Sequence, residues 1–351
     1  MKHIFSVHSP VTFLISWAVI ENLNLPEKDV LLLTHNYNPP LEKYKTLESI
    51  DSYEGKSIFR KLFQLNYPKS FDASLYQTIG NEPFKAYVDM MHPRQMMLAT
   101  NENCHSFCFI EEGNASYTDE DDLDSVTWRE REAPWRMSYS RKSIFKALTR
   151  ISRGYSLKLL SMPYHFRAYS HFKNIKYYCF SSSAFPKIPV EKKEVVTPHT
   201  VSPDLDKMSA GYELNNEFIW IDGSNSRFTG LPEEVYHNAI DKAIEKLKHQ
   251  LNNQDQINVK LRPGLKDPEN NYLVSRLEKE GYAVNIMEDN MVIEAVLLKS
   301  EDCTVIGNLS SVLFYAAIFG HKAYSLYGLF EKKVFTYFDQ MPGYWEKVEK
   351  L

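Results

Sequence analysis

The sequence has few cysteines, no long apolar run and almost no net charge, and each of these shortages excludes a class of protein. The four cysteines are too few and too scattered for a disulfide-stapled secreted domain, so a reducing cytoplasm is the expected setting. The longest apolar stretch near the start, residues 11–20, is about half of the length that crosses a bilayer, and no small-residue cleavage site follows it. We therefore expect neither a transmembrane span nor a signal peptide.

The charge balance and the composition exclude further classes of protein. The chain has 41 basic and 45 acidic residues, a formal net charge of -4, which argues against a general nucleic-acid coat protein. With 43% hydrophobic and 25% charged residues, the composition is globular and excludes a disordered, collagen-like or heptad-repeat protein. No internal repeat is visible, and a length of 351 residues predicts about two domains.

The N-terminal half alternates short apolar strands with helices. Residues 2–7 predict a strand, Ser9-Pro10 begins an apolar helix that ends near Leu25, and residues 30–34 predict a second, buried strand. A further strand is expected at residues 106–110. This β-α-β opening is typical of a doubly wound α/β domain.

The second half repeats this pattern from residue 217 onward. Strands are expected at residues 218–221, 257–261 and 303–306, and helices at residues 231–251, 273–280 and 312–319. Residues 184–206 contain four prolines and no helical period, which predicts an interdomain linker. The expected organisation is an N-terminal α/β domain at 1–183, the linker at 184–206, a C-terminal α/β domain at 207–330 and a helical tail at 331–351. Because ligands bind at the carboxyl ends of parallel strands, we expect an active site in the cleft between the domains.

An acidic pair, Glu111-Glu112, followed by Gly113, closes a strand of the first half. Adjacent side chains at a strand end point opposite ways, so one carboxylate would enter the cleft while the other faces solvent or structure. A carboxylate in a water-poor cleft can act as a general base toward a hydroxyl. The alternative interpretation is an ordinary surface turn.

A serine pair, Ser310-Ser311, stands between an apolar strand and an apolar helix. Backbone N–H groups and hydroxyls at a helix N-terminus can hold a phosphate. The alternative is that one serine is only a helix cap.

Lys260 and Arg262 end a strand of the same half, just before Pro263-Gly264. Alternation places the two cations on one face, where a guanidinium fits two phosphate oxygens. An ordinary solvated turn is the alternative.

No metal site is predicted. Cys104, His105 and Cys108 lack a second Cys/His pair at zinc spacing, so buried strand cysteines are expected there.

In this order, the strand-helix start over Ile4–Pro10, the acidic-acidic-Gly motif and the late serine pair resemble the bacterial sialyltransferases of GT-B fold. That family includes the enzymes that build lipooligosaccharide, capsule and polysialic acid. The resemblance implies an α/β fold of two Rossmann-like, doubly wound domains that face a central cleft. It also implies that Glu111 is the proposed general base, with Glu112 and Gly113 completing the motif.

The resemblance further implies a donor site in the second half. Ser310 and Ser311 match the serines that hold the phosphate of a CMP-sugar, and Glu294 lies where relatives place a glutamate on the ribose hydroxyls. Relatives carry a histidine before the proline of the Lys260–Pro263 segment, whereas this chain carries Arg262, which can neutralise the phosphate but cannot donate a proton at neutral pH. His92-Pro93 does not restore that motif, because it precedes the acidic pair.

The implied activity is an inverting, metal-independent transfer of sialic acid, or a related nonulosonic acid, from a CMP donor to a hydroxyl of a surface glycan. It needs no cofactor. Two alternatives stay open: a GT-B transferase that uses another nucleotide sugar for a capsule or teichoic-type polymer, and a non-catalytic glycan-binding or assembly protein.

A basic segment occupies residues 129–173, where eleven Lys and Arg residues against two Glu give a formal charge of +9. Three interpretations compete: a solvated helix face, a groove for an anionic acceptor, and a patch that holds a cytoplasmic protein peripherally on the inner membrane. No nucleic-acid-binding motif accompanies the charge. The residues assigned to an acceptor or membrane patch are Arg136, Arg141, Lys142, Lys146, Arg150 and Arg153.

Overall fold

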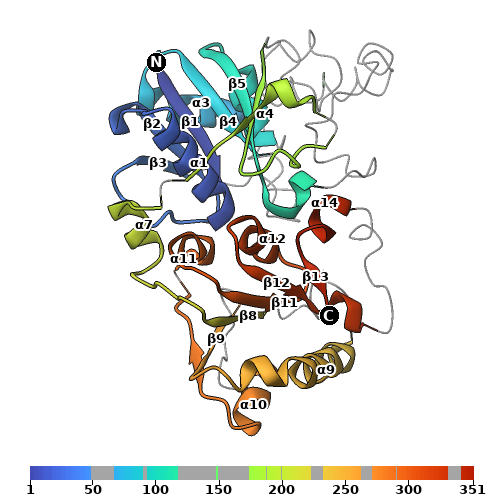
Figure 1. Cartoon of the computed structure of the whole chain (residues 1–351). Coiled ribbons are helices and arrows are strands. Elements are labelled where there is room, and N and C mark those ends of the chain that lie inside the picture. Colours follow the sequence, from blue (N-terminus) through green and yellow to red (C-terminus); the bar gives the residue numbers. More distant parts are fainter. Residues whose placement is uncertain are drawn as a thin grey trace, which may run out of the picture. The chain divides into compact units, whose positions relative to one another are not determined.

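A computed structural model of the chain forms two compact units, each built on its own parallel sheet (Figure 1). The structure describes residues 1–48, 67–89, 93–117, 148, 174–186, 188–198, 200–222, 232–261, 271–289, 291–330 and 341–351. The first unit comprises Met1–Ser116 and Asp121–Pro198, and the second comprises Tyr117–Glu120 and His199–Leu351. Within the described residues, no helix combines the length and the hydropathy that a bilayer span requires.

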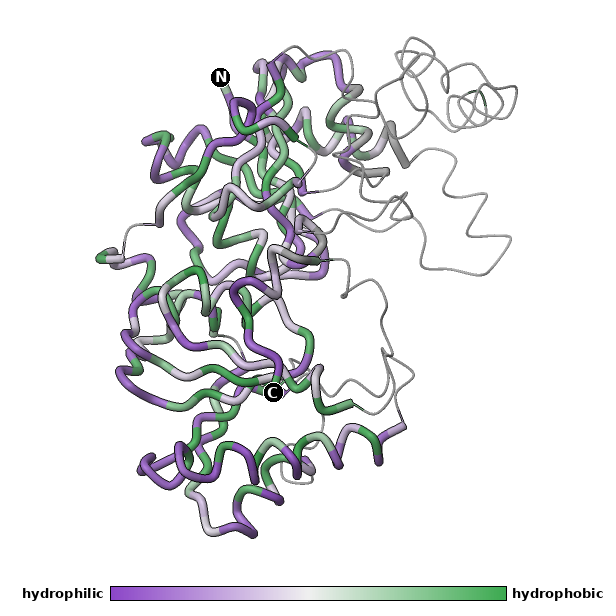
Figure 2. Tube along the Cα trace, turned by 45° about the vertical axis from the view of Figure 1, so that its right-hand side comes forward, coloured by the Kyte–Doolittle hydropathy of each residue, from purple (hydrophilic) through white to green (hydrophobic). Residues whose placement is uncertain are grey.

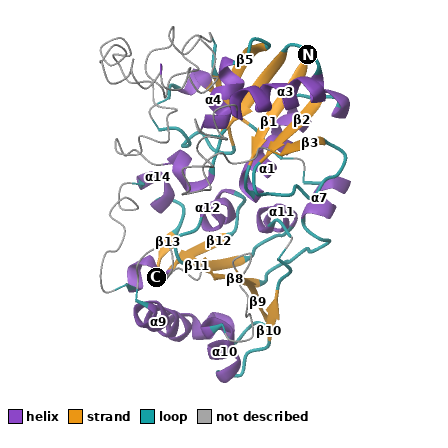
Figure 3. Ribbon diagram, turned by 180° about the vertical axis from the view of Figure 1, so that it is seen from behind, coloured by secondary structure: helices purple, strands orange, loops and turns teal. Residues whose placement is uncertain are grey.

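The first unit contains a seven-stranded sheet in the order β3-β2-β1-β4-β5-β6-β7. The strands are β1 (Lys2–Val7), β2 (Val30–Thr34), β3 (Lys45–Glu48), β4 (Phe84–Val88), β5 (Cys104–Ile110), β6 (Lys176–Cys179) and β7 (Lys193–Val195), and every pairing is parallel. The helices are α1 (Pro10–Asn22), η1 (Glu27–Asp29), α3 (Tyr67–Ile79), α4 (Pro93–Thr100), η3 (Gly113–Tyr117) and η5 (Val190–Lys192). Helix α1 covers one face of this sheet, and α3 and α4 cover the other (Figures 1 and 3).

Helix α1 forms where the sequence predicts a helix, and its start is fixed locally. Ser9 accepts a hydrogen bond from the N–H of Thr12, and the Thr12 hydroxyl accepts one from the N–H of Ser9, so the two residues form a capping box. Pro10 occupies the first turn, where no N–H is needed. Residues 11–20 are all buried, as expected for a helix that is apolar all round.

The second unit contains a six-stranded parallel sheet in the order β10-β9-β8-β11-β12-β13. Its strands are β8 (Phe218–Asp222), β9 (Ile257–Leu261), β10 (Val284–Ile286), β11 (Thr304–Gly307), β12 (Lys322–Ser325) and β13 (Glu349–Lys350). Its helices are α7 (Pro203–Met208), α9 (Glu233–Leu251), α10 (Tyr272–Lys279), α11 (Ile293–Lys299), α12 (Ser311–Ile318), η6 (Leu326–Leu329) and α14 (Pro342–Trp345). Helices α9 and α10 lie on one side of the sheet, and α11 and α12 on the other (Figure 1).

Helix α9 shows how the sequence pattern positions an element in this unit. Its buried residues recur at helical spacing, and Figure 2 shows hydrophobic and hydrophilic positions alternating along it. The buried side, which includes Tyr236, Ile240, Ile244 and Leu247, joins the core formed with strands β8 and β9. Two glutamates in the first turn, Glu233 and Glu234, complement the helix dipole.

The expected fold class is confirmed, because both sheets are parallel with helices on both faces. The range expected to be a linker, 184–206, includes the boundary between the two units, Pro198/His199, and is not free of secondary structure. It contains η5 and strand β7, which pairs with β6 in the first sheet, and it ends within α7. The prolines occupy element starts there: Pro189 precedes η5, and Pro203 begins α7. The tail expected to be helical contains only the short α14 and then strand β13, within residues 341–351.

Candidate functional site

Polar side chains gather where three neighbouring strands of the first sheet end. His8 follows β1, Asp89 follows β4, and Glu111 and Glu112 follow β5. These strands are adjacent in the order β1-β4-β5, and parallel strands end at the same edge of a sheet. The chain also reverses its winding between β1 and β4, and such a switch point is where open α/β sheets bind ligands.

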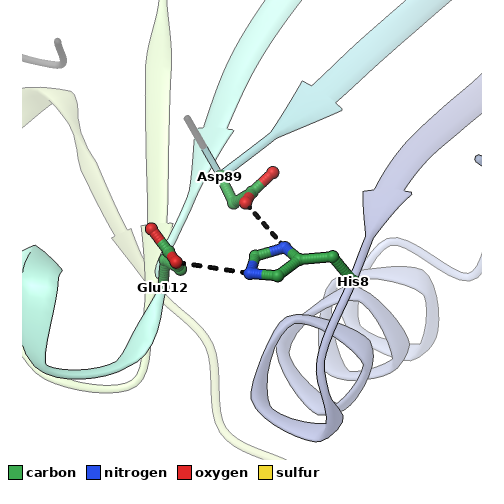
Figure 4. Close-up of side chains that lie close together, drawn as sticks. All are labelled: His8, Asp89 and Glu112. Carbon is green, nitrogen blue, oxygen red and sulfur yellow. Dashed lines mark ion pairs between the residues drawn. The ribbon is translucent and has the colours of Figure 1, made fainter. Parts of the chain in front are cut away.

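The imidazole of His8 lies between two carboxylates (Figure 4). Its Nδ1 atom is 2.9 Å from Oδ2 of Asp89, and its Nε2 atom is 3.3 Å from Oε1 of Glu112. The Asp89 side chain is fully buried, whereas the side chains of His8 and Glu112 are each 21% exposed. We call His8, Asp89 and Glu112 the ion-paired triad.

The triad holds a proton on His8 at neutral pH. Burial by itself lowers the pKa of His8, but the flanking carboxylates of Asp89 and Glu112 outweigh it and raise that pKa to about 10. The fully buried carboxylate of Asp89 requires a cation beside it, because an unpaired buried charge would lower the stability of the fold. His8 is therefore an imidazolium in this arrangement, with both ring nitrogens protonated.

Contacts with neighbouring polar groups fix the members of the ion-paired triad. Nε2 of Gln95 donates to Oγ of Ser6 at 2.8 Å and lies 3.5 Å from Oδ1 of Asp89. The backbone N–H of His8 donates to Oγ1 of Thr12 at 3.1 Å, so the start of α1 fixes the position of the histidine. The backbone N–H of Glu112 donates to Oγ of Ser116 at 2.7 Å. The backbone of His8 and of Glu112 is thus held by hydrogen bonds, and the carboxylate of Asp89 contacts the amide of Gln95.

The adjacent residue Glu111 has a different environment. It is fully buried, its N–H donates to the Tyr178 carbonyl at 3.0 Å, and its Oε2 atom accepts the N–H of Phe180 at 2.8 Å. The expectation that the two carboxylates point apart agrees with this arrangement: Glu111 faces the chain after β6, and Glu112 faces His8. Gly113 has φ of 51°, a left-handed conformation that favours glycine.

The same triad is a set of residue types that could hold a cation. Within the described part of the chain, its ligand atoms all lie within 4.8 Å of one another. A metal would have to displace a proton from the His8 imidazolium, which the two carboxylates stabilise. Cys104 and Cys108 are buried on β5, as the sequence predicts.

A second set of predicted residues lies at the carboxyl edge of the second sheet, around the start of α12. Ser310 is the N-cap, its Oγ atom accepting the N–H of Val312 at 3.2 Å, and Ser311 is the first helical residue. Both are half-exposed. A Cβ at Gly307 would lie 2.9 Å from the carbonyl oxygen of Ile221, so glycine is needed for the close approach of β11 to β8. Ser310 is thus a helix cap, and the hydroxyl of Ser311 plays no part in that cap.

Three buried polar residues lie in this unit: Lys260 on β9, Glu294 on α11 and Asn308 directly after β11. Lys260 donates to the carbonyl oxygens of Glu288 and Asp289 at 2.6 and 3.2 Å, and burial lowers its pKa. Burial raises the pKa of Glu294 to about 7. Asn308 is 2% exposed, and neither amide atom of its side chain has a hydrogen-bond partner among the described residues. A buried amide without partners is unusual in a folded protein and fits a position that a ligand completes.

The remaining predicted site residues lie outside the described residues. They are Arg262, Pro263, Arg136, Arg141, Lys142, Lys146, Arg150 and Arg153.

The sequence of the chain matches the model of a known family. That family is alpha-2,8-polysialyltransferase (POLYST), and the match covers residues 3–327. The chain belongs to this family. It is therefore a sialyltransferase, and the expected resemblance is confirmed. No curated protein matches the sequence.

The solved structures that resemble this polysialyltransferase-family chain do so at low sequence identity. UDP-GlcNAc 2-epimerase of Methanocaldococcus jannaschii is 12% identical, with 100% of this chain and 89% of the other covered and a TM-score of 0.50. MurG of Acinetobacter baumannii is 10% identical, with 100% and 86% covered and a TM-score of 0.43. The fold is GT-B-like, with two parallel sheets and their helices.

Sequence reasoning alone missed two residues of the triad, His8 and Asp89. Each is the first residue after a strand, so the rule that ligands bind at the carboxyl ends of strands was the signal that could have found them. Strand β4 was not expected from the sequence, and Asp89 could not be placed without it.

Proposed function

We propose that this member of the polysialyltransferase family transfers sialic acid, or a related nonulosonic acid, from a CMP-sugar to a hydroxyl of a surface glycan. The proposed transfer inverts the anomeric carbon and needs no metal. The observation that carries the proposal is the family match over residues 3–327, together with an acidic pair at the carboxyl end of β5. Lipooligosaccharide, capsule and other surface polysaccharides are the acceptor classes that the resemblance suggests.

The donor phosphate in this proposal binds at the start of α12. Two half-exposed serines at a helix N-terminus suit an anion, and Arg262 would add a positive charge. The Ser310 hydroxyl is already a helix cap, so Ser311 is the serine better suited to a direct contact.

The nucleoside in this proposal binds against Glu294 and Asn308. Oε2 of Glu294 has no hydrogen-bond partner among the described residues and would accept a ribose hydroxyl. The Asn308 amide offers both a donor and an acceptor, as a pyrimidine base requires. Lys260 would support the site indirectly, because its ammonium donates hydrogen bonds to the carbonyl oxygens of Glu288 and Asp289. Pro263 stays a predicted donor residue from the resemblance.

The chemical step needs a base for the acceptor hydroxyl and stabilisation of the departing phosphate. A carboxylate of the Glu111-Glu112 pair takes the proton, and the resemblance places that role at Glu111. Ser310, Ser311 and Arg262 would stabilise the charge that develops on the CMP phosphate.

The basic residues of the segment 129–173 are proposed to contact an anionic acceptor or the cytoplasmic face of the inner membrane. The charge of that segment supports this proposal, since polybasic surfaces bind anionic lipids and anionic polymers.

A thermal-shift panel with CMP, CDP, UDP and GDP tests the donor assignment. A ligand that binds only the folded protein raises its stability by RT ln(1 + [L]/Kd), so a shift with cytidine nucleotides alone is the expected result. Ser311→Ala and Asn308→Ala should each reduce the thermal shift. Thr304→Ala, at the start of strand β11, should leave the shift unchanged. A shift selective for UDP would overturn the proposal in favour of another nucleotide sugar.

A further inference from the structure

We infer that the C-terminal segment 341–351 positions the loop of residues 308–310 between β11 and α12, and that Tyr344 is the main residue through which it acts. We call residues 308–310 the donor loop, because the inference rests on the proposed binding of the donor phosphate at the start of α12. The C-terminal segment lies beyond residues 3–327, the part of the chain that the family model matches.

The hydroxyl of Tyr344 contacts the donor loop directly. It donates a hydrogen bond to the carbonyl oxygen of Ser310 at 3.0 Å, and Tyr344 is fully buried. Its ring stacks on Phe314 of α12, with 5.8 Å between the ring centroids and 16° between the planes. Helices α14 and α12 lie side by side in Figures 1 and 3. One side chain of the C-terminal segment thus holds both the donor loop and the helix that follows it.

The bond from Tyr344 acts on the peptide group that joins Ser310 to Ser311. The carbonyl and the N–H of a trans peptide lie in one plane and point in opposite directions, and the described residues contain no cis peptide bond. Ser311 is the first residue of α12, where an N–H has no acceptor within its own helix. Fixing the Ser310 carbonyl therefore orients the Ser311 N–H toward an anion at the helix start, and it also strengthens that N–H as a donor.

A second hydroxyl holds the other end of the donor loop. Oγ of Ser325 donates to the carbonyl oxygen of Asn308 at 2.8 Å and accepts the N–H of Tyr327 at 3.2 Å. Ser325 lies on β12, and its carbonyl oxygen accepts the N–H of Leu351, the residue after β13, at 3.0 Å. The C-terminal segment therefore supports the donor loop at two carbonyls, directly at Ser310 and through β12 at Asn308.

The C-terminal segment packs closely on the second unit. The ring of Trp345 stacks on that of Tyr327 with 5.3 Å between the centroids, and Nζ of Lys350 lies 4.1 Å from the centroid of the Trp345 ring. A Cβ at Gly328 would collide with the carbonyl oxygen of Leu351. Because these contacts fix the segment, its hydrogen bond to the donor loop can fix the loop in turn.

A buried side chain of the donor loop points independently to a ligand. Asn308 is 2% exposed, and the oxygen and nitrogen of its side-chain amide have no hydrogen-bond partner among the described residues. Leaving a buried amide unpaired lowers stability, so such a position suits a ligand that completes it. The support from Tyr344 and Ser325 is therefore given to a loop with an independent sign of ligand binding.

The experiment compares Tyr344→Phe and Ser325→Ala with the wild type in the full-length protein. Phenylalanine at position 344 keeps the ring that packs on Phe314 and removes only the hydroxyl. The matched control is Tyr282→Phe, which removes a hydroxyl that donates to Asn252 at 2.9 Å, away from the donor loop in the turn before β10. The Kd of CMP, the KM values for CMP-sialic acid and for an oligosialic acid acceptor, and the melting temperature are measured for each protein.

Tyr344→Phe is expected to raise both the Kd of CMP and the KM for CMP-sialic acid by about tenfold, because the bond that orients the Ser311 N–H is lost. The KM for the acceptor should stay within about twofold of the wild-type value, since the acceptor does not bind the donor loop. Ser325→Ala should raise the Kd of CMP by about threefold or more. Tyr282→Phe should leave the Kd and both KM values unchanged.

Two outcomes overturn the inference. One is a CMP Kd in Tyr344→Phe within about twofold of the wild type, whatever the melting temperature, because the tyrosine then serves only the core. The other is a KM for the acceptor that rises as much as the KM for the donor, because a general loss of structure acts on both.

If Tyr344→Phe shows no cooperative melting transition, the CMP Kd of Ser325→Ala decides, and a wild-type value overturns the inference. A wild-type protein that neither binds CMP nor transfers sialic acid would instead mean that the proposed function has failed.

Discussion

The imidazole of His8 lies 2.9 Å from the carboxylate of Asp89, although one residue follows β1 and the other follows β4. The contact exists because β1 and β4 are neighbours in the sheet, with Phe5 opposite Tyr87 in the register. It places a cation beside a fully buried anion at the switch point of the first sheet. The predictions on the first unit follow from this pair.

The charge of His8 should persist well above neutral pH. Its pKa is raised from 6.5 to about 10, so its imidazole nitrogen signals should stay those of the protonated form at about pH 8.5. Histidine-selective ¹⁵N NMR of the wild type and of His8→Gln identifies the signal among the 11 histidines. A His8 signal that titrates near pH 6.5 would show that the carboxylates do not hold the proton.

The same raised pKa of His8 gives stability a pH dependence of fixed sign. The folded protein keeps a proton that the unfolded chain releases above pH 6.5, so the contribution of His8 is complete below that pH and is lost as the pH rises toward 10. The excess of the wild-type free energy of unfolding over that of His8→Gln should therefore fall between about pH 7 and pH 9, by at most about 1.4 kcal/mol per pH unit. Urea unfolding at several pH values measures it. An excess that grows with pH would contradict the sign.

The losses of stability on removing each partner of the His8–Asp89 pair should not add. His8→Gln removes the cation beside the buried Asp89 carboxylate, and a loss of about 3 kcal/mol in the free energy of unfolding is expected. The double variant His8→Gln/Asp89→Asn should lose less than the sum of the single losses, because the buried side chain at position 89 then carries no charge. Urea unfolding of the four proteins gives the coupling energy. Strict additivity would mean that the two groups do not interact.

The two serines at the start of α12 should separate into a cap and a ligand contact. Ser310→Ala removes the hydroxyl that accepts the Val312 N–H and should cost about 1 kcal/mol of stability. Ser311→Ala leaves that cap in place and should keep the melting temperature while it weakens CMP binding. Differential scanning fluorimetry with and without CMP distinguishes the two effects. Equal losses of stability in both variants, with equal CMP affinity, would remove the phosphate role.

The basic segment should give membrane binding that depends on lipid charge and on salt. The wild type is expected to sediment with vesicles that contain anionic phospholipid and to be released by salt, whereas vesicles of phosphatidylcholine alone should not bind it. Replacing Arg141, Lys142 and Lys146 together by Gln should weaken the binding. Failure to bind anionic vesicles would exclude the membrane patch and leave the anionic-acceptor groove and the solvated helix face as the two interpretations of this segment.

The sequence predicted several of the apolar, central strands, but it missed the central, buried strand β4 and the strands that are short or at the edges. Strands β2 and β9 form at the residues expected, because runs such as Val30–Thr34 are buried on both faces. Strands β3, β7, β10 and β13 are two to four residues long and are exposed or half-exposed, so they carry no apolar signal. Two of the four prolines that predicted a linker, Pro189 and Pro203, stand at the starts of η5 and α7.

The candidate site was predictable only where it lies in one continuous motif. Glu111-Glu112 and Ser310-Ser311 each follow a strand in an unbroken segment, so their place in the sheet could be inferred. The triad depends on the order β1-β4-β5, in which the chain crosses from one side of β1 to the other. That order is set by packing of the whole sheet and is not written in any local spacing, which is why His8 and Asp89 emerged only from the structure.

The measurement that tests the account most directly is transfer of labelled sugar by the purified full-length chain. It is incubated with CMP-sialic acid labelled in the sugar and an oligosialic acid acceptor, and in parallel with labelled UDP-GlcNAc. Label is expected to move from CMP-sialic acid into a larger acceptor product, and UDP-GlcNAc is expected to stay unchanged. Turnover of UDP-GlcNAc with no transfer from CMP-sialic acid would contradict the account.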